Sequence, residues 1–255
     1  MGAIRRVGEL TYHVAPRLVR AAEQICYDAY DSLSWSQYAR PLVVPFSVGG
    51  IRFKLSVVSD HRRAQRQYGK LSATGAVYEP VMMACLTRIM QCAREPVFMD
   101  VGAFMGYYAC YASALVKDEK PVFAVESNPR YAEAIRASCR VNGFRRLQVC
   151  CAALSDRSAT VGIDGEAVRP DGAGTLQVPS LTMDELCRRE GIAPTVLKMD
   201  VHGAEGMVIR GMPQTLANSV EHLLIEIHPV HVLDRYSPGV TRSDLLDLLE
   251  SAGLT

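Results

Sequence analysis

Apolar residues have helical spacing within residues 1 to 40, and the pattern changes to β-rich segments over residues 41 to 58. Apolar and polar residues alternate regularly from Ile51 to Val57, and Gly49-Gly50 separates this run from the apolar residues 42 to 46. A Gly-Gly pair between two such runs predicts a β-hairpin.

From residue 77 onward helical and strand-like segments take turns, which predicts an α/β fold with a mostly parallel sheet covered by helices on both faces. Residues 77 to 255 are predicted to form this domain. Residues 1 to 76 are predicted to form an extension, with a helical cap before the hairpin and a polar connection over 59 to 76. The expected strands are 96 to 100, 121 to 126, 147 to 153, 195 to 200 and 223 to 228. The expected helices are 79 to 93, 106 to 116, 129 to 141, 182 to 190, 204 to 210 and 242 to 251, with a polar, Gly-rich segment up to about 179.

The helix over 129 to 141 has clear start and stop signals, because Asn128 can cap it, Pro129 fits its first turn and Asn142-Gly143 can end it. A sheet of this type usually continues beyond the last expected helix, where this chain stops. We therefore expect a truncated C-terminal end; the alternative is that the hairpin occupies that edge of the sheet.

Composition excludes several classes of protein. With 28 Lys+Arg against 27 Asp+Glu, the net charge of +1 gives no reason to expect nucleic acid as a partner. The eight cysteines form no C-x-x-C pair and lie mostly in apolar segments, which favours free thiols in a reducing compartment. No segment reaches 18 apolar residues and no signal peptide is evident, so we expect a cytoplasmic protein that does not bind a membrane.

The first strand of the main domain runs into a glycine turn. Residues 97 to 108 are an apolar run broken by Asp100, Gly102 and Gly106, which predicts a strand, a tight turn and a helix start where a ligand can approach the backbone. The spacing differs from the dinucleotide motif G-x-G-x-x-G. The next strand ends in Glu126, about 20 residues further on, where doubly wound folds hydrogen-bond a ribose.

Further polar residues are expected at the same edge of the sheet, because ligands of open α/β sheets lie at the carboxyl ends of the strands. Period-two alternation places Lys198, Asp200 and His202 on one face of the fourth strand, and Glu226 and His228 on one face of the fifth. Since unpaired buried charges are costly, Lys198, Asp200 and Glu226 could also pair with one another.

The charges favour a methyl donor over NAD. The chain has no Walker Gly-Lys-Ser/Thr sequence. An acid at Asp100 repels a pyrophosphate but suits the sulfonium and amino groups of S-adenosylmethionine, while Glu126 can accept hydrogen bonds from both ribose hydroxyls.

These motifs together resemble the FkbM family of S-adenosylmethionine-dependent methyltransferases, a class I methyltransferase group. The similar segments are Tyr78-Glu79, Asp100-Val-Gly-Ala-Phe-Met-Gly106, Glu126-Ser-Asn-Pro129, Ala153-Leu-Ser-Asp156, Leu197-Lys-Met-Asp-Val-His-Gly-Ala-Glu205 and Leu224-Ile-Glu-Ile-His-Pro229. Phe104 stands where the family motif D-V-G-A-N-x-G has Asn. His202 replaces the first Glu of K-x-D-V-E-G-A-E, and Ser127 is a milder change from E-P-x-P.

The resemblance implies a Rossmann-like fold, S-adenosylmethionine as cofactor with S-adenosylhomocysteine as product, and a small-molecule acceptor with a hydroxyl on a sugar, polyketide or other secondary metabolite. Asp100, Gly102 and Gly106 are expected at the methionine moiety, Glu126 at the ribose, and Ser155 and Asp156 near the adenine. The same donor-binding motifs add Glu79, Ala103, Ser127 and Asn128.

For the catalytic base we prefer His202, then Asp200, then His228, because imidazole titrates near neutral pH. No ligand spacing calls for a divalent metal, although Asp200 and neighbouring acids could hold one. Two other functions stay open, an NAD-type oxidoreductase and a catalytically degenerate binding protein of the same fold. Neither the acceptor nor an oligomeric state is indicated by any motif; the acceptor pocket is expected from residues 1 to 76 and 157 to 180.

Overall fold

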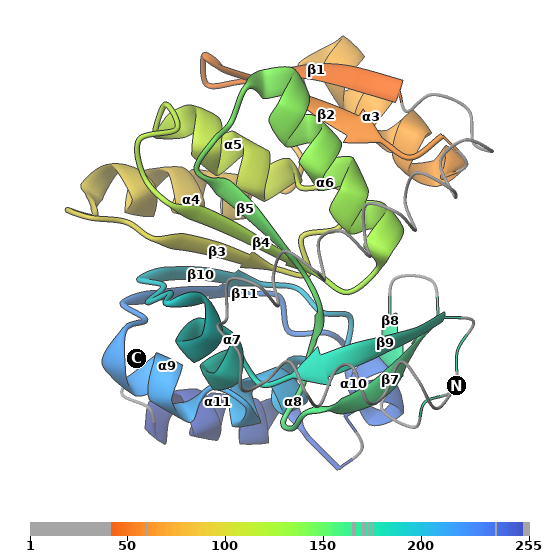
Figure 1. Ribbon diagram of the computed structural model, residues 1–255, viewed down its shortest axis with the longest axis vertical. Coiled ribbons are helices and arrows are strands. Elements are labelled where there is room, and N and C mark those ends of the chain that lie inside the picture. The colour runs from red at the N-terminus through yellow and green to blue at the C-terminus, as the bar shows by residue number, and fades with distance from the viewer. Residues whose placement is uncertain are drawn as a thin grey trace, which may run out of the picture. The chain divides into compact units, whose positions relative to one another are not determined.

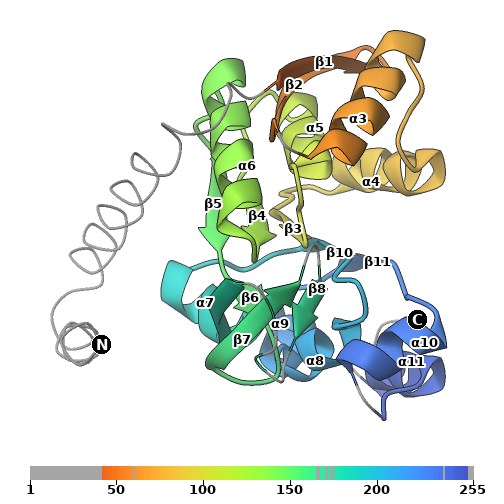
Figure 2. The same ribbon diagram turned by 90° about the vertical axis from the view of Figure 1, so that its right-hand side faces the viewer.

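Helices cover both faces of a central parallel sheet (Figures 1 and 2) in this computed structural model, which describes residues 42–59, 61–164, 167–169, 172, 174, 176–237 and 239–251. The predicted N-terminal helical cap lies outside the described residues. The sheet has the order β11-β10-β3-β4-β5, and all its strands are parallel. Its strands are β3 (Phe98–Val101), β4 (Val122–Glu126), β5 (Leu147–Cys151), β10 (Val196–Met199) and β11 (His222–Ile225). The predicted Rossmann-like α/β fold is therefore confirmed.

The central strands β3, β4 and β10 are buried along their whole length. Strands covered on both faces read as continuous apolar runs, which is why their sequences alternate so little. The exceptions are polar residues at the carboxyl ends, and the register places Asp100 of β3 beside Lys198 of β10.

Eight helices of the described residues flank this sheet. One face carries α4 (Pro80–Cys92), α5 (Tyr107–Leu115) and α6 (Pro129–Asn142); the other carries α7 (Met183–Glu190), α8 (Glu205–Arg210), α9 (Pro213–Asn218), α10 (Val230–Tyr236) and α11 (Arg242–Ser251). The predicted caps of α6 are present, since the Asn128 side chain accepts a hydrogen bond from the Arg130 backbone N–H and Gly143 ends the helix with a left-handed φ of 74°. The short helices α9 and α10 were not predicted.

The predicted hairpin forms from β1 (Leu42–Val48) and β2 (Ile51–Val57), with left-handed backbone at Gly49 and Gly50. It packs on α5 and α6: Leu55 is completely buried, and the Ser56 N–H donates to Ser138 Oγ at 2.8 Å. It forms a separate two-stranded sheet, so the alternative that it occupies an edge of the main sheet is wrong.

The polar segment 59 to 76 is not a simple connection, because most of it forms α3 (Arg62–Thr74). His61 Nδ1 accepts a hydrogen bond from the Ala64 N–H, and Gly75 ends the helix in a left-handed conformation. Only Ala64 and Tyr68, one turn apart, are buried within it. Because so few residues of this polar helix are buried, its helical periodicity of apolar residues is too weak to predict the helix from the sequence.

The Gly-rich segment up to 179 also contains structure that the sequence did not predict. A four-stranded sheet of order β6-β9-β7-β8 forms from β6 (Ala153–Leu154), β7 (Ala159–Asp164), β8 (Ala167–Arg169) and β9 (Leu176–Leu181). Its small core consists of Ala153, Val161, Ile163 and Val178. The predicted strand 147 to 153 is correspondingly split, since β5 ends at Cys151 and the chain then enters the second sheet. Among the described residues, no helix is long and apolar enough to cross a membrane.

Candidate active site

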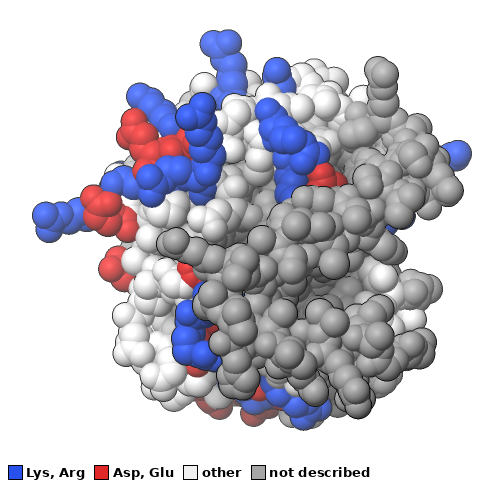
Figure 3. All heavy atoms as spheres, in the orientation of Figure 1, with Lys and Arg blue, Asp and Glu red and all other residues white. Residues whose placement is uncertain are grey.

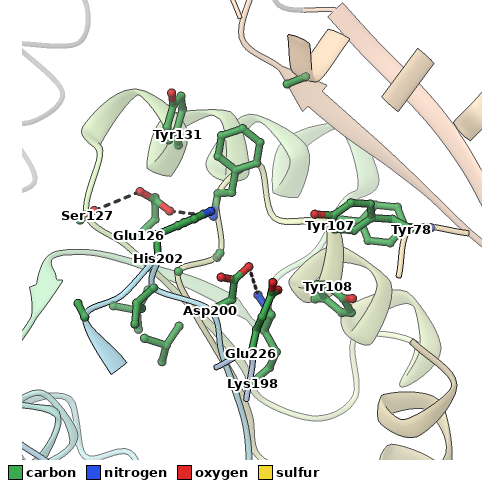
Figure 4. A pocket seen from close by; sticks show the side chains of 18 of the residues that line it. Tyr78, Tyr107, Tyr108, Glu126, Ser127, Tyr131, Lys198, Asp200, His202 and Glu226 are labelled. Carbon is green, nitrogen blue, oxygen red and sulfur yellow. Dashed lines mark hydrogen bonds and ion pairs between the residues drawn. The ribbon is translucent and has the colours of Figure 1, made fainter. Parts of the chain in front are cut away.

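A pocket opens at the carboxyl ends of β3, β4 and β10, where the sequence predicted a ligand site (Figure 4). Seven of the predicted site residues line it: Glu79, Gly102, Ala103, Glu126, Ser127, Asp200 and His202. The other six do not line it: Asp100, Gly106, Asn128, Ser155, Asp156 and His228.

The glycine turn brings the ends of β3 and β10 together. Gly102 has a φ of 74°, and a Cβ on it would lie 1.8 Å from the Asp200 carbonyl oxygen. Gly106 has a φ of 78°, and its Cβ would lie 3.0 Å from Ile135 of α6. Glycine is therefore needed at Gly102 for close packing as well as for backbone conformation.

Glu126 is held at the end of β4 by two backbone amides. Its Oε2 accepts a hydrogen bond from the Phe104 N–H at 2.8 Å, and its Oε1 accepts one from the Asn128 N–H at 2.7 Å. Burial raises the pKa of Glu126 to about 7, against the opposing effect of these two hydrogen bonds. Both adjacent turns thus orient one carboxylate through backbone groups.

Asp100 lies beneath the pocket and is 1 % exposed. Lys198 Nζ lies 3.5 Å from Asp100 Oδ1 and 3.6 Å from Asp200 Oδ2, and 5.0 Å from the centre of the Tyr108 ring. Burial opposes the charge on Lys198, but the surrounding carboxylates, Asp100 foremost, outweigh it and raise the pKa of the lysine. The negative charge of Asp100 is therefore balanced by a buried lysine, and the acids that line the pocket are other residues.

Those acids are Glu79, Glu126, Asp200 and Glu226. Glu79 accepts a hydrogen bond from the Tyr108 hydroxyl at 2.7 Å. Burial raises the pKa of Glu226, and the nearby Asp200 adds to this effect. Most of the charge that faces a ligand is thus negative, which suits a cationic one.

The three residues predicted as catalytic candidates lie together at the ends of β10 and β11. The rings of His202 and His228 have centres 5.0 Å apart, and His228 Nε2 lies 3.9 Å from Asp200 Oδ1. His228 Nδ1 lies 2.9 Å from Oε1 of Glu205, which is completely buried. This hydrogen bond raises the pKa of His228. Figure 4 shows Asp200 and His202 on the same side of the pocket.

Sequence reasoning gave no role to Glu205, although it ends the quoted motif of the fourth strand. It also missed the wall formed by α3 and its N-cap residue, because no helix was predicted there. The lining residues of this wall include His61, Arg63, Gln67 and Tyr68. Phe104 packs edge-on against Tyr131 and His61, with ring centres 4.8 Å and 5.3 Å away.

Strained backbone concentrates at this pocket. Five non-glycine residues of the described chain have positive φ, and three of them line it: Glu79 (43°), Phe104 (50°) and His202 (50°). Such conformations cost about 1–3 kcal/mol each and gather at functional sites, where surrounding structure maintains them. Two of the three are the positions at which the sequence departs from the motifs it resembles.

The methyltransferase FkbM domain model matches residues 100 to 253 of this sequence. The chain belongs to the FkbM methyltransferase family. This membership confirms the resemblance seen in the motifs, and the cofactor is S-adenosylmethionine.

Similar proteins include the hexuronic acid methyltransferase AglP of Haloferax volcanii, 28% identical over 173 residues that span 63% of this chain. The match spans 64% of the length of AglP. Among solved structures, a SAM dependent methyltransferase from Agrobacterium tumefaciens has a TM-score of 0.46 at 11% identity. This match covers 86% of this FkbM chain and 60% of the Agrobacterium chain. Precorrin-6y C5,15-methyltransferase from Geobacter metallireducens GS-15 has a TM-score of 0.41 at 17% identity. This match covers 67% of this chain and 68% of the precorrin methyltransferase chain.

Proposed function

We propose that this protein transfers the methyl group of S-adenosylmethionine to a hydroxyl oxygen of a sugar acid or a similar small molecule. The observation that carries the proposal is the meeting of the glycine turn, the Glu126 carboxylate and the Asp200–His202 pair in one pocket at the carboxyl ends of β3, β4 and β10. A carboxylate that can accept the ribose hydroxyls and an imidazole that can accept a proton line the same pocket, which suits a donor and a hydroxylated acceptor.

Each part of S-adenosylmethionine has a proposed place in the pocket. The two ribose hydroxyls donate to Glu126, and the adenine lies against residues 152 to 154, which line the pocket next to Ser127. The methionine moiety lies along Gly102 and Ala103. Of the predicted donor residues, Asp100, Gly106, Asn128, Ser155 and Asp156 act by supporting this surface, because they lie outside the lining.

Methyl transfer is an in-line displacement at a carbon activated by the sulfonium. The acceptor oxygen forms a bond to the methyl carbon as the carbon–sulfur bond breaks, and S-adenosylhomocysteine leaves. Alignment supplies much of the rate, and a base that takes the hydroxyl proton adds about two to four orders of magnitude. His202 is the imidazole that lines the pocket, so we assign it this role.

The sugar acid is proposed from the α3 wall together with the acceptor named for AglP. Arg63 is exposed at the pocket, and a guanidinium can bind a carboxylate with two parallel hydrogen bonds. A uronic acid would therefore place its carboxylate at Arg63 and a ring hydroxyl towards His202. Elsewhere, Lys and Arg side chains in the upper part of Figure 3 stand beside Asp and Glu, so the basic charge on this face is partly balanced.

Calorimetric titration with S-adenosylmethionine and NAD side by side tests the donor. We expect binding of S-adenosylmethionine and none of NAD; binding of NAD alone would show that the proposal is wrong and would favour the NAD-type oxidoreductase. A panel of free and glycosidic uronic acids, neutral sugars and hydroxylated polyketides then tests the acceptor. Donor binding without transfer to any of them would favour the degenerate binding protein.

Two variants separate the proposed roles. His202→Ala should lower turnover while donor affinity stays nearly unchanged, and equal loss of both would indicate a structural role. Arg63→Gln should raise the KM for a uronic acid by about tenfold, consistent with the loss of a charge-assisted contact. The same variant should leave the KM for a neutral sugar unchanged, and an equal effect on both would contradict the carboxylate contact.

A further inference from the structure

Two imidazoles and one carboxylate converge at the pocket. One ligand atom from each of Asp200, His202 and His228 lies within 4.8 Å of the other two. They come from the segment that follows β10 and from the segment that follows β11. Period-two alternation had placed these residues on two separate strands, and only the fold brings them together.

His228 is oriented by a carboxylate from the far side. Its Nδ1 lies 2.9 Å from Oε1 of the completely buried Glu205, which leaves Nε2 directed towards Asp200 at 3.9 Å. Histidines that bind metals usually have their second nitrogen held in this way, because the partner fixes the tautomer and the ring orientation. Glu205 is thus placed as a positioning residue.

Asp200 has its two oxygens in different surroundings. Its Oδ2 faces the Lys198 ammonium at 3.6 Å, whereas its Oδ1 is buried and accepts no hydrogen bond from the described residues. A buried carboxylate oxygen without a hydrogen bond is costly unless a ligand satisfies it. Oδ1 is the atom that faces His228.

His202 completes the set from the pocket side. It lines the pocket and has a left-handed backbone, with a φ of 50°. The motif that the sequence resembles has Glu here, so the second imidazole is a feature of this chain. The exchange of Glu for His turns an acidic pair into a mixed nitrogen and oxygen donor set.

We propose that Asp200, His202 and His228 bind a divalent first-row transition metal ion at the floor of the pocket. Two imidazole nitrogens and one carboxylate oxygen suit Zn²⁺, Co²⁺ or Fe²⁺ and leave coordination positions open, whereas Mg²⁺ and Ca²⁺ prefer oxygen ligands alone. Bonds of about 2.0–2.2 Å place neighbouring ligand atoms roughly 3 Å apart, so side-chain rotations must close the present gaps by about 1–2 Å. The acids of the pocket balance the charge of the ion.

The role of the metal rests on the proposed function and deepens it. An acceptor hydroxyl that coordinates the ion loses its proton more readily, because the metal lowers its pKa. The proton then passes to solvent water, and the oxygen forms its bond to the methyl carbon as the carbon–sulfur bond breaks. A sugar acid could place a hydroxyl and a neighbouring oxygen on the open positions together. In the metal-free protein His202 is the base, as proposed above, and with the ion bound His202 becomes a ligand while the ion activates the hydroxyl.

The metal is tested directly by titrating tag-free, metal-depleted protein with Co²⁺ and recording the visible spectrum. We expect one equivalent to bind with absorption of a nitrogen- and oxygen-ligated ion. Exposed Cys85 and Cys92 can also bind Co²⁺, so both are replaced by Ser in the protein used. Asp200→Asn, His202→Gln and His228→Gln should each weaken binding by more than tenfold, and Glu205→Gln by about 10–100-fold. His222→Gln, at an exposed histidine of β11, is the matched control and should change nothing.

Unchanged circular dichroism and thermal unfolding of each variant show that it folds. Absence of Co²⁺ binding by the folded protein, or binding that none of the three substitutions weakens, would overturn the metal site. Calorimetry with S-adenosylmethionine in the presence of chelator separates the two proposals. Donor binding without Co²⁺ binding would leave methyl transfer standing and remove the metal, whereas Co²⁺ binding without donor binding would do the reverse.

Discussion

Replacing Gly102 by Ala tests whether the pocket depends on the close approach of β3 and β10. A Cβ at this position would lie 1.8 Å from the Asp200 carbonyl oxygen and 2.9 Å from its carbonyl carbon. Both neighbours are backbone atoms in the middle of the site, so they cannot rotate away as a flexible side chain would. To restore an ordinary contact, the carbonyl oxygen would have to move from 1.8 Å to about 3.4 Å.

Two costs add in Gly102→Ala. An L-residue with a left-handed backbone costs about 1–2 kcal/mol, and forcing an extra methyl into packed structure costs typically about 1–3 kcal/mol. Gly143 has the same φ of 74° and no atom within 4 Å of its Cβ position, so Gly143→Ala carries the first cost alone. We expect a loss of about 2–5 kcal/mol of unfolding free energy for Gly102→Ala and about 1–2 kcal/mol for Gly143→Ala.

Urea unfolding of the two variants and the wild type measures this difference. Total stabilities of about 5–15 kcal/mol leave room for Gly102→Ala to fold. Donor affinity should also fall in Gly102→Ala, because the clash displaces Asp200 and the turn, but not in Gly143→Ala. Equal losses of stability in the two variants would refute the reasoning, since only the backbone conformation would then matter.

Three further outcomes are expected. In the proposed donor site the ribose hydroxyls donate to the carboxylate form of Glu126, and burial raises the pKa of Glu126 to about 7, so calorimetric donor affinity should fall about tenfold from pH 8 to pH 6. A Glu126→Gln variant with the same pH dependence would contradict this. Phe104→Asn should change donor affinity by less than about threefold, because Phe104 contacts Glu126 through its backbone N–H. A tenfold loss of donor affinity would show that the Phe104 side chain itself takes part in donor binding. Leu55→Ala should lower the free energy of unfolding in urea by about 2–5 kcal/mol, and Leu42→Ala, at an exposed residue of the same hairpin, by less than about 0.5 kcal/mol. Similar losses in the two variants would mean that the hairpin is not part of the core.

The sequence predicted the elements that have strong periodicity or strong caps. Strands β3, β4 and β10 are apolar apart from Asp100, Glu126 and Lys198, and α6 lies between the capping residues Asn128 and Gly143. Both patterns could therefore be recognised in the sequence. The helix α3 was not predicted, because only Ala64 and Tyr68 of its 13 residues are buried. The second sheet was not predicted either, because few of its residues are buried and glycines interrupt its sequence.

The site residues that belong to one local sequence motif could be predicted from the sequence. Gly102 and Glu126 were identified because their positions at a strand end and a turn follow from local pattern. The pairing of Lys198 with Asp100 was not predicted, since the sequence offered Lys198 only Asp200 and Glu226 as partners, and the register between β3 and β10 is a property of the fold. The contact between His228 and Glu205 joins residues 23 apart in the sequence and had no local signal.

The two larger departures from the family motifs share one strained backbone conformation, so each side chain must be considered together with the energetic cost of its backbone. Phe104 and His202 both have a φ of 50° and both line the pocket. Asn tolerates that conformation better than most residues, whereas Phe gains nothing there from its backbone and is stabilised by its contacts with Tyr131 and His61. His202 adds an imidazole beside Asp200 and His228 at the same strained turn. At both positions this chain therefore holds an aromatic ring on a strained backbone that lines the pocket.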